Sequence, residues 1–156
     1  MTTENEAPTR QQQLASGIIG NDVSFLMARA NAVSLGTARD ALAEHDLRVR
    51  SYSVLALACD HARPSQKEIA EFLRLDPSQV VSLIDDLQTR GLVERMPDPR
   101  DRRSNVLVAT EAGREAHARA RVDVLRAEDA LLSGLTAEER ETLGRMLRRL
   151  AFPPND

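Results

Sequence analysis

Arginine is concentrated in one short stretch of this chain. Residues 90–103 contain five arginines and three acidic residues and are therefore net positive, although the whole chain carries a net charge of −3. Guanidinium groups on a stiff, protruding turn can enter the minor groove of duplex DNA, where the potential is most negative. Four side chains of this turn are predicted to contact DNA: Arg100, Asp101, Arg102 and Arg103. Asp101 would form a charge-assisted hydrogen bond that directs Arg103. The alternative is an ordinary solvated turn.

A second polar set lies on a helix predicted over residues 77–90. Asp76 is a strong N-cap residue, Pro77 suits the first helical position, and Gly91 is a natural C-terminal stop. With about 100° between successive residues, one face of this helix is apolar and the opposite face is polar. Serine and glutamine can donate to phosphates or base edges, and valine can contact a thymine methyl group. The predicted contacts are Ser78, Gln79, Val81, Ser82, Asp86 and Arg90, and the alternative is ordinary exposed helix positions.

The same helix carries two acids that oppose this interpretation. Asp85 and Asp86 would repel phosphate. Asp86 could instead accept a hydrogen bond from a cytosine amino group, or form a salt bridge to Arg90. If the acidic character dominates, the helix would suit a protein partner rather than DNA. A winged-helix module for protein–protein interaction is therefore one alternative function.

The neighbouring elements predict a helix-turn-helix followed by a wing. The tetrad Ser65-Gln66-Lys67-Glu68 is a capping box that starts a short helix, and a turn of about three residues leads to the next helix. Ser65 and Gln66, at the start of this first helix, are further candidates for DNA contact. Residues 92–95 and 104–108 predict two strands, and the two prolines between them exclude a helix. This hairpin forms a wing over residues 95–104.

The segments outside this region are predicted to be helical. We expect a flexible arm over residues 1–13, one long helix from about Gly17 to Leu47 with a weak point at Gly36, and two helices after Thr110. The apolar stripes of these helices have more surface than the core of one winged-helix domain can bury. The predicted fold class is mainly α with a small β-hairpin. A winged helix-turn-helix domain spans residues 48–110, and residues 14–47 and 111–152 form a helical dimerisation region.

Composition limits the class of protein. Hydrophobic residues make up 42% and aromatic residues 3% of the chain, which is enough for a core of aliphatic side chains. No apolar run approaches the roughly 20 residues of a membrane span, and the N-terminus has no signal-peptide pattern. We expect a cytoplasmic protein without membrane contact. No nucleophile motif, phosphate loop or metal-ligand spacing stands out, so we expect no enzyme, no cofactor and no metal site.

Cys59 is the only cysteine, so no intramolecular disulfide can form. It is either a small hydrophobic residue on a helix or a redox-sensing thiol, which would need exposure and a low pKa. A redox-responsive regulator that uses Cys59 is therefore a second alternative.

The stretch from Ser65 to Gly113 resembles the winged-helix core of the MarR family. The most specific part is DPRDRRSNVLVATEAG, in which the D-x-R of the wing tip falls on Asp101 and Arg103. The sequence departs from the family pattern on the recognition helix. Many members carry Thr-Arg where this chain has Val81 and Ser82, and a further Arg where it has Asp86. A larger share of the affinity should therefore come from the wing and from phosphate contacts.

The resemblance implies a homodimer held by the first helix and the last two. It also implies recognition helices in successive major grooves, wings in the flanking minor grooves, and an effector pocket between the dimerisation and DNA-binding parts. The implied partners are double-stranded DNA, a second copy of the chain and a small aromatic or phenolic effector. Candidate effector contacts are Phe25, Tyr52 and Leu55, with core packing as the alternative. The predicted function is a transcriptional regulator, a repressor, with a pseudo-palindromic operator.

Overall fold

The computed structural model describes residues 8–99, 101 and 103–154. The chain divides into two compact units, Met1–Gly36 and Thr37–Asp156, and the boundary falls within helix α2 (Val23–Leu42). The first unit contains α1 (Arg10–Ala15), a single turn of 3₁₀ helix, η1 (Ile19–Asn21), and the first part of α2.

The predicted boundaries at the N-terminal end were wrong in two respects. Residues 10–13 were expected in a flexible arm, but they belong to α1, which begins with a capping box between Thr9 and Gln12. The long helix expected over residues 17–47 is shorter, because α2 begins at Val23 and ends at Leu42. Glycine, asparagine and aspartate at residues 20–22 have low helix propensity. Gly36, the expected weak point, lies inside the helix.

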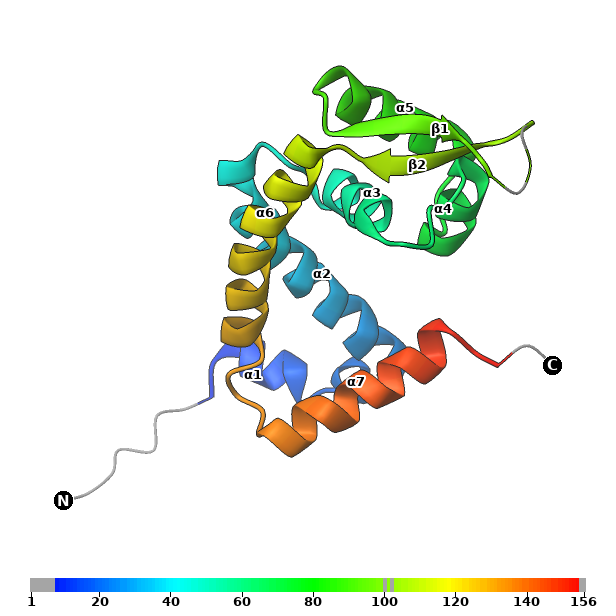
Figure 1. Ribbon diagram of the computed structural model, residues 1–156. Helices are drawn as coiled ribbons and strands as arrows, with labels where there is room; N and C mark the ends of the chain where they lie inside the picture. Colours follow the sequence, from blue (N-terminus) through cyan, green and yellow to red (C-terminus); the bar gives the residue numbers. More distant parts are fainter. Residues whose placement is uncertain (1–7, 100, 102, 155–156) are drawn as a thin grey trace. The chain divides into compact units, whose positions relative to one another are not determined.

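The second unit confirms the predicted fold class, mainly α with a small β-hairpin (Figure 1). After α2 its elements are η2 (Ala43–His45), α3 (Val49–Cys59), α4 (Gln66–Leu73), α5 (Pro77–Thr89), β1 (Val93–Pro97), β2 (Asn105–Ala109), α6 (Glu111–Leu131) and α7 (Ala137–Ala151). The two strands are antiparallel, with Val93 opposite Ala109 and Pro97 opposite Asn105. The hairpin lies beside α4 and α5 in Figure 1.

Local sequence signals account for where these helices begin and end. The predicted capping box is present at Ser65, and a second one is present at Thr136; in each, the hydroxyl accepts from the backbone N–H of a glutamate three residues on. Thr110 caps α6 by accepting from the N–H of Gly113. Gly91 follows α5 with a φ of +69°, a left-handed conformation that suits glycine at a helix end. The capping box at Ser65 and the stop at Gly91 were predicted correctly from the sequence.

The core lies where α3, α4, α5, the hairpin and the beginning of α6 meet. Its largest fully buried side chains are Leu42, Leu55, Ile69, Ile84, Leu87 and Leu107. Gly113 brings α6 against the hairpin, since a Cβ there would lie 1.9 Å from the carbonyl oxygen of Leu92. The ring of His45, in η2, lies 2.8 Å from the carboxylate of Asp123 and so connects α6 to the end of α2.

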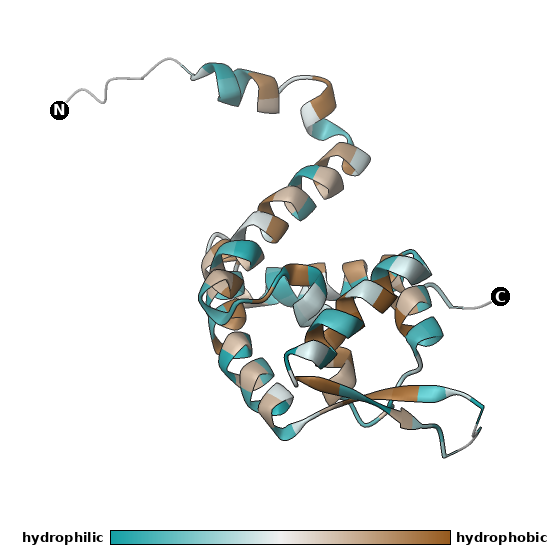
Figure 2. Cartoon of the chain, turned by 90° about the horizontal axis from the view of Figure 1, so that it is seen from above, coloured by the Kyte–Doolittle hydropathy of each residue, from teal (hydrophilic) through white to brown (hydrophobic). Residues whose placement is uncertain are grey.

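The helices after the hairpin behave differently from this core. None of the residues of α7 is buried, and its apolar residues occur at helical spacing: Leu143, Met146, Leu147 and Leu150. In α6, Val122 and Leu125 are also exposed. Figure 2 shows brown apolar residues recurring along the long helices as well as in the winged helix. Exposed apolar faces of this kind are typical of surfaces that bind a partner.

Candidate nucleic-acid interface

The helix-turn-helix consists of α4 and α5, joined by residues 74–76. Asp76 caps α5: its carboxylate accepts from the hydroxyl and from the backbone N–H of Ser78. The hydroxyl bond, with the backbone bond second, holds the pKa of Asp76 below its usual value. The Ser78 hydroxyl, a predicted DNA donor, is therefore already engaged in starting the helix.

The two faces of α5 are arranged as the periodicity predicted. Val80, Ile84 and Leu87 are fully buried. Gln79, Val81 and Ser82 are exposed, together with the acids of this helix. Leu83, beside them, is only half-buried. The exposed set is close in sequence and short in side-chain length, which is the arrangement a helix needs to approach base edges.

Both acids of α5 are paired with arginines. The guanidinium of Arg90 lies 3.5 Å from the carboxylate of Asp86, as the sequence predicted, and also 3.5 Å from that of Asp46. Asp85 forms an ion pair with Arg95 of β1. Each negative charge on the predicted recognition helix therefore has a positive partner within the same unit. The repulsion expected between this helix and phosphate is correspondingly reduced.

Arg95 is a site residue that the sequence analysis missed. Its Nε donates to the Gln66 side chain at 2.8 Å, and its two terminal nitrogens donate to Gln88 and Asp85. One guanidinium thus joins α4, α5 and the first strand of the wing. Its position in the strand could have indicated this role, because Arg95 lies on the same inward face of the strand as the buried Val93. A charge on an inward face requires partners.

The residues at the start of α4 also have internal partners. The Ser65 hydroxyl, besides capping the helix, donates to the Glu68 carboxylate at 2.7 Å. Ser65 pairs with Val106 of β2 through an isolated β-bridge. Gln66 accepts from Arg95. Both predicted DNA contacts therefore hold the first helix against the wing, which leaves only their remaining hydrogen-bonding capacity for a ligand.

The tip of the wing is built on Asp101. Arg100 and Arg102, two of the predicted contacts, lie outside the described residues. Asp101 accepts from the backbone N–H of Arg103 at 3.0 Å, and its carbonyl accepts from the N–H of Ser104. The hydrogen bond predicted between Asp101 and Arg103 is therefore made by the backbone N–H of Arg103, in an Asx turn, and not by its guanidinium. The side chain of Arg103 is exposed.

The predicted effector residues fall in different environments. Leu55 is fully buried in the core. Tyr52 is half-buried and stacks on His117 of α6, with 5.4 Å between ring centroids and 24° between planes. The Nε2 atom of His117 is buried without a hydrogen-bond partner. Burial and, secondly, the charge of Arg121 lower the pKa of His117. Phe25 is half-buried in the first unit, and its grouping with Tyr52 stays a prediction.

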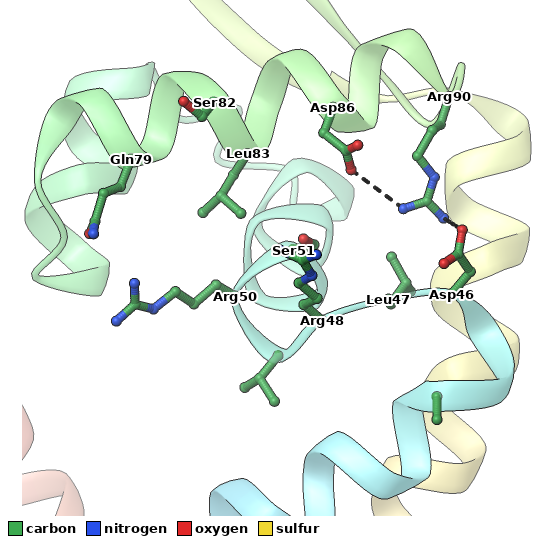
Figure 3. A pocket seen from close by; sticks show the side chains of 12 residues that line it. Asp46, Leu47, Arg48, Arg50, Ser51, Gln79, Ser82, Leu83, Asp86 and Arg90 are labelled. Carbon is green, nitrogen blue, oxygen red and sulfur yellow. Dashed lines mark ion pairs between the residues drawn. The ribbon is translucent and has the colours of Figure 1, made fainter.

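A separate cavity of about 860 Å³ lies between α5 and the segment that leads into α3 (Figure 3). Gln79, Ser82 and Leu83 line it from α5, and Arg48, Arg50 and Ser51 line it from the other side. The sequence analysis did not single out the two arginines. Four of the predicted DNA contacts therefore line this concave site: Gln79, Ser82, Asp86 and Arg90.

The environment of Cys59 disfavours the redox alternative. The thiol is half-buried, and burial raises its pKa, against a smaller lowering effect of Arg114. A raised pKa reduces the thiolate fraction, which is the reactive form. Among the described residues, no group of His, Cys, Asp or Glu is placed to hold a metal ion. Within the same residues, no helix combines the length and apolarity that crossing a membrane requires.

Comparison with known proteins agrees with this geometry. Residues 47–105 match the model of the MarR family. CouR from Rhodococcus jostii RHA1, solved with bound p-coumaroyl-CoA, is 39% identical, with a TM-score of 0.83 over 90% of this chain and 99% of CouR. A MarR-family transcriptional regulator from Rhodococcus sp. RHA1 is likewise 39% identical, with a TM-score of 0.83 over 90% of this chain and the whole of that one.

A third relative is the transcriptional repressor NicR of Pseudomonas putida, which is 33% identical over 92 residues, 58% of each chain. The two Rhodococcus proteins are matched over almost their whole length at an identity well above the level at which only the fold is shared. The chain therefore belongs to the MarR family of winged helix-turn-helix transcriptional regulators.

Proposed function

We propose that this protein is a homodimeric repressor that binds a pseudo-palindromic operator and is released from it by a small aromatic effector. The recognition helix, residues 77–90, would enter the major groove, and the wing, residues 95–104, would enter the minor groove. The observation that supports this most is the pairing of Asp85 with Arg95 and of Asp86 with Arg90. It removes the main objection to DNA binding, which was the acidic recognition helix.

The proposed DNA contacts differ in what they can offer. Gln79, Val81 and Ser82 are exposed on α5 and form the proposed base-reading set. Arg103 at the wing, with Arg100 and Arg102, supplies the proposed charge for phosphates and the minor groove. Ser65, Gln66 and Ser78 have internal hydrogen-bond partners, so their proposed role is to place backbone amides and to contact phosphates with their remaining capacity.

Dimerisation is supported by the exposed apolar faces of the helices outside the winged helix. Leu143, Met146, Leu147 and Leu150 recur at the spacing of one helix face and are all at least 36% exposed. A second copy would cover this face and bury it by a two-fold contact. Two-fold symmetry would place the recognition helices about 34 Å apart, which accounts for the proposed pseudo-palindrome.

Repression and effector control are suggested by the relatives. NicR is named as a repressor, and CouR was solved with p-coumaroyl-CoA, a thioester of a phenolic acid. We propose an aromatic or phenolic effector for this protein as well. Tyr52 and His117 are its proposed contacts, because their rings stack and the buried Nε2 atom of His117 has no partner. Such an effector would act through different affinities for two states of the dimer.

The experiment that tests this proposal is selection of bound duplexes from a random pool at two salt concentrations. We expect enrichment of a pseudo-palindrome with half-sites about one helical turn apart, and weaker binding at the higher salt. Arg103→Ala should weaken binding to the selected duplex, whereas Arg119→Ala, an exposed arginine of α6, should not. An absence of enrichment at low salt would contradict the proposal and favour the interaction-module alternative.

A further inference from the structure

Two aromatic rings from distant parts of the second unit meet on its surface. The chain has only three phenylalanines, and two of them stack on each other. Phe72 of α4 and Phe152, the C-cap of α7, have 5.5 Å between ring centroids and 27° between ring planes. The two residues remain 55% and 54% exposed. The stack therefore lies outside the core and joins two elements that the core does not hold together.

On the α4 side, Phe72 is exposed, whereas Ile69 and Ala70 of the same helix are buried in the core. An exposed phenylalanine adds nothing to that core. Its contact with Phe152 removes part of the ring from water and adds the attraction between two stacked rings. The gain from this side chain therefore lies in the connection with α7.

On the α7 side, the last turn of the helix holds the ring of Phe152 in place. The backbone N–H of Phe152 donates to the carbonyl of Arg148 at 2.9 Å, so this residue still belongs to the hydrogen-bond ladder of the helix. Pro153 and Pro154 follow, and a proline cannot continue that ladder. The position of the ring is therefore determined by α7, so that a movement of α7 moves the ring.

The helix-turn-helix and the wing are themselves joined to α4. Arg95 of β1 donates to Gln66 of α4 and to Gln88 and Asp85 of α5. A force applied to α4 at Phe72 therefore acts on the recognition helix and the wing together. At the other end of the connection, α7 carries the exposed apolar face that we propose as a dimerisation surface.

The stack is the second of two attachments between the winged helix and the helices that follow it. The first is at the beginning of α6, which the close approach of Gly113 to the Leu92 carbonyl holds against the hairpin. A body attached at one place can still rotate about it. A second attachment, at the far end of α7, restricts that rotation.

We propose that Phe72 and Phe152 are positioning residues for operator binding. Their stack fixes the orientation of the winged helix relative to the dimerisation helices, and thereby the separation of the two recognition helices. This rests on the proposed function, in which a dimer binds two half-sites. Recognition helices that are held at the correct separation lose less conformational freedom on binding an operator of matching spacing. Loss of the stack should therefore weaken binding and also reduce the preference for one spacing.

The first measurement is operator affinity as a function of half-site spacing. The selected duplex is compared with two derivatives that have one base pair added or removed between the half-sites. Phe72→Ala should weaken binding to the selected duplex about fivefold and should lose less than the wild type on the derivatives. Phe152→Ala should do the same. The double variant should bind no more weakly than either single variant, because both changes remove the same contact.

Two variants serve as controls for this measurement. Phe152→Tyr keeps an aromatic ring at the stack and should retain the wild-type affinity and preference for spacing. Arg119→Ala, at an exposed position of α6, should also bind like the wild type. Thermal melts establish that all variants are folded.

A second measurement tests the contact without DNA. The chain contains no tryptophan, so Phe152→Trp introduces a single fluorescent reporter at the stack. Its emission should move to longer wavelength when Phe72→Ala is added, because the indole loses the ring that covers it.

The two measurements separate this proposal from the proposed function. Unchanged emission would show that the two side chains do not meet in solution and would overturn the proposal, whatever the DNA selection shows. Emission that responds, together with alanine variants that keep the wild-type preference for spacing, would also overturn it. Emission that responds in a protein that selects no duplex would remove the regulator function, and with it the role of the stack in operator binding.

Discussion

The winged-helix region and the helices that follow it use aliphatic residues in opposite ways. In the winged helix, Ile84, Leu87 and Leu107 are completely buried. In α7 no residue is buried, and Leu150 is 64% exposed. The first region has its core within one chain, so its stability should not depend on protein concentration. The second lacks a covering surface, so its stability should depend on a second copy.

This comparison gives the largest expected effect to a change inside the winged helix. A methyl group at Gly113 would lie 1.9 Å from the Leu92 carbonyl oxygen and 3.3 Å from the Leu55 side chain. The first contact is with backbone, which cannot move aside without shifting α6 from the hairpin. Gly113→Ala should therefore lower the free energy of unfolding by about 3 kcal/mol or more. Urea denaturation measures this loss.

The control for this variant is Gly144→Ala in α7, where a Cβ would meet nothing within 4 Å. This change should leave stability equal or slightly higher, because alanine has the better helix propensity. The loss in Gly113→Ala should be the same at low and high protein concentration. A loss that disappears at high concentration would show that α6 is held by the dimer and not by the hairpin.

The second largest effect is expected from a change on the exposed face of α7, and it should alter the dimerisation of two chains but not the stability of the winged helix. Leu147 lies in the middle of the exposed apolar stripe of α7 and is 47% exposed. Leu147→Glu places a charge in the proposed interface and should weaken dimerisation about a hundredfold, or about 2.7 kcal/mol. Sedimentation equilibrium measures the change. Glu141→Gln, an exposed position of the same helix, is the control, and equal dimerisation of all three proteins would contradict the proposed interface.

The sequence predicted the winged helix well because its signals are local. Capping boxes, the left-handed Gly91 and the alternation of buried and exposed residues on α5 are each determined within a few residues. The helix boundaries near residues 17–22 and 43–46 were wrong, since weak breakers decide them only in context. The two ion pairs of Arg90, one with Asp86 and one with Asp46, illustrate the difference between local and long-range signals. The first, four residues away, was predicted, whereas the second depends on tertiary packing.

The same distinction explains what was missed in the candidate site. Arg95 joins Gln66, 29 residues before it, to two residues of α5. The cavity is formed where Arg48 and Arg50 meet the side of α5. Both features bring together segments that are distant in sequence, and no local pattern specifies them. At the wing, the predicted partner of Asp101, Arg103, is present, but the donor is its backbone N–H, which lies two residues away in an Asx turn.

A third, smaller effect tests how the wing is held to the recognition helix. Arg95→Ala removes three side-chain hydrogen bonds and leaves Asp85 without its cation. We expect a loss of about 1–2 kcal/mol in unfolding free energy, because the guanidinium is partly buried, and about a tenfold loss in operator affinity. Fluorescence anisotropy with the selected duplex measures the affinity.

The double variant Arg95→Ala with Asp85→Ala separates charge from positioning. If the unpaired carboxylate causes the loss of operator affinity, removing it should restore much of that affinity while stability stays low. If the position of the wing causes the loss, the double variant should bind as weakly as Arg95→Ala. A wild-type affinity in Arg95→Ala itself would show that Arg95 has no part in DNA binding.

The smallest expected effect concerns the contact between α3 and α6. Burial and Arg121 lower the pKa of His117 in the folded state, so the unfolded chain takes up a proton at this residue at higher pH than the folded chain does. The free energy of unfolding should therefore fall as the pH is lowered from about 7, through the ordinary histidine range near pH 6.5, until the folded state is protonated as well.

The variant His117→Phe keeps a ring against Tyr52, which stacks on His117 at 5.4 Å, and removes the titrating group. Its unfolding free energy should fall less steeply between pH 7 and pH 5 than that of the wild type, as measured by urea denaturation at each pH. His61→Phe, a change at an exposed histidine, is the control and should keep the wild-type slope. Equal slopes in all three proteins would mean that burial of His117 has no effect on its protonation. A steeper slope in the wild type than in His117→Phe would place a proton-sensitive contact between α3 of the winged helix and α6, which belongs to the proposed dimerisation region.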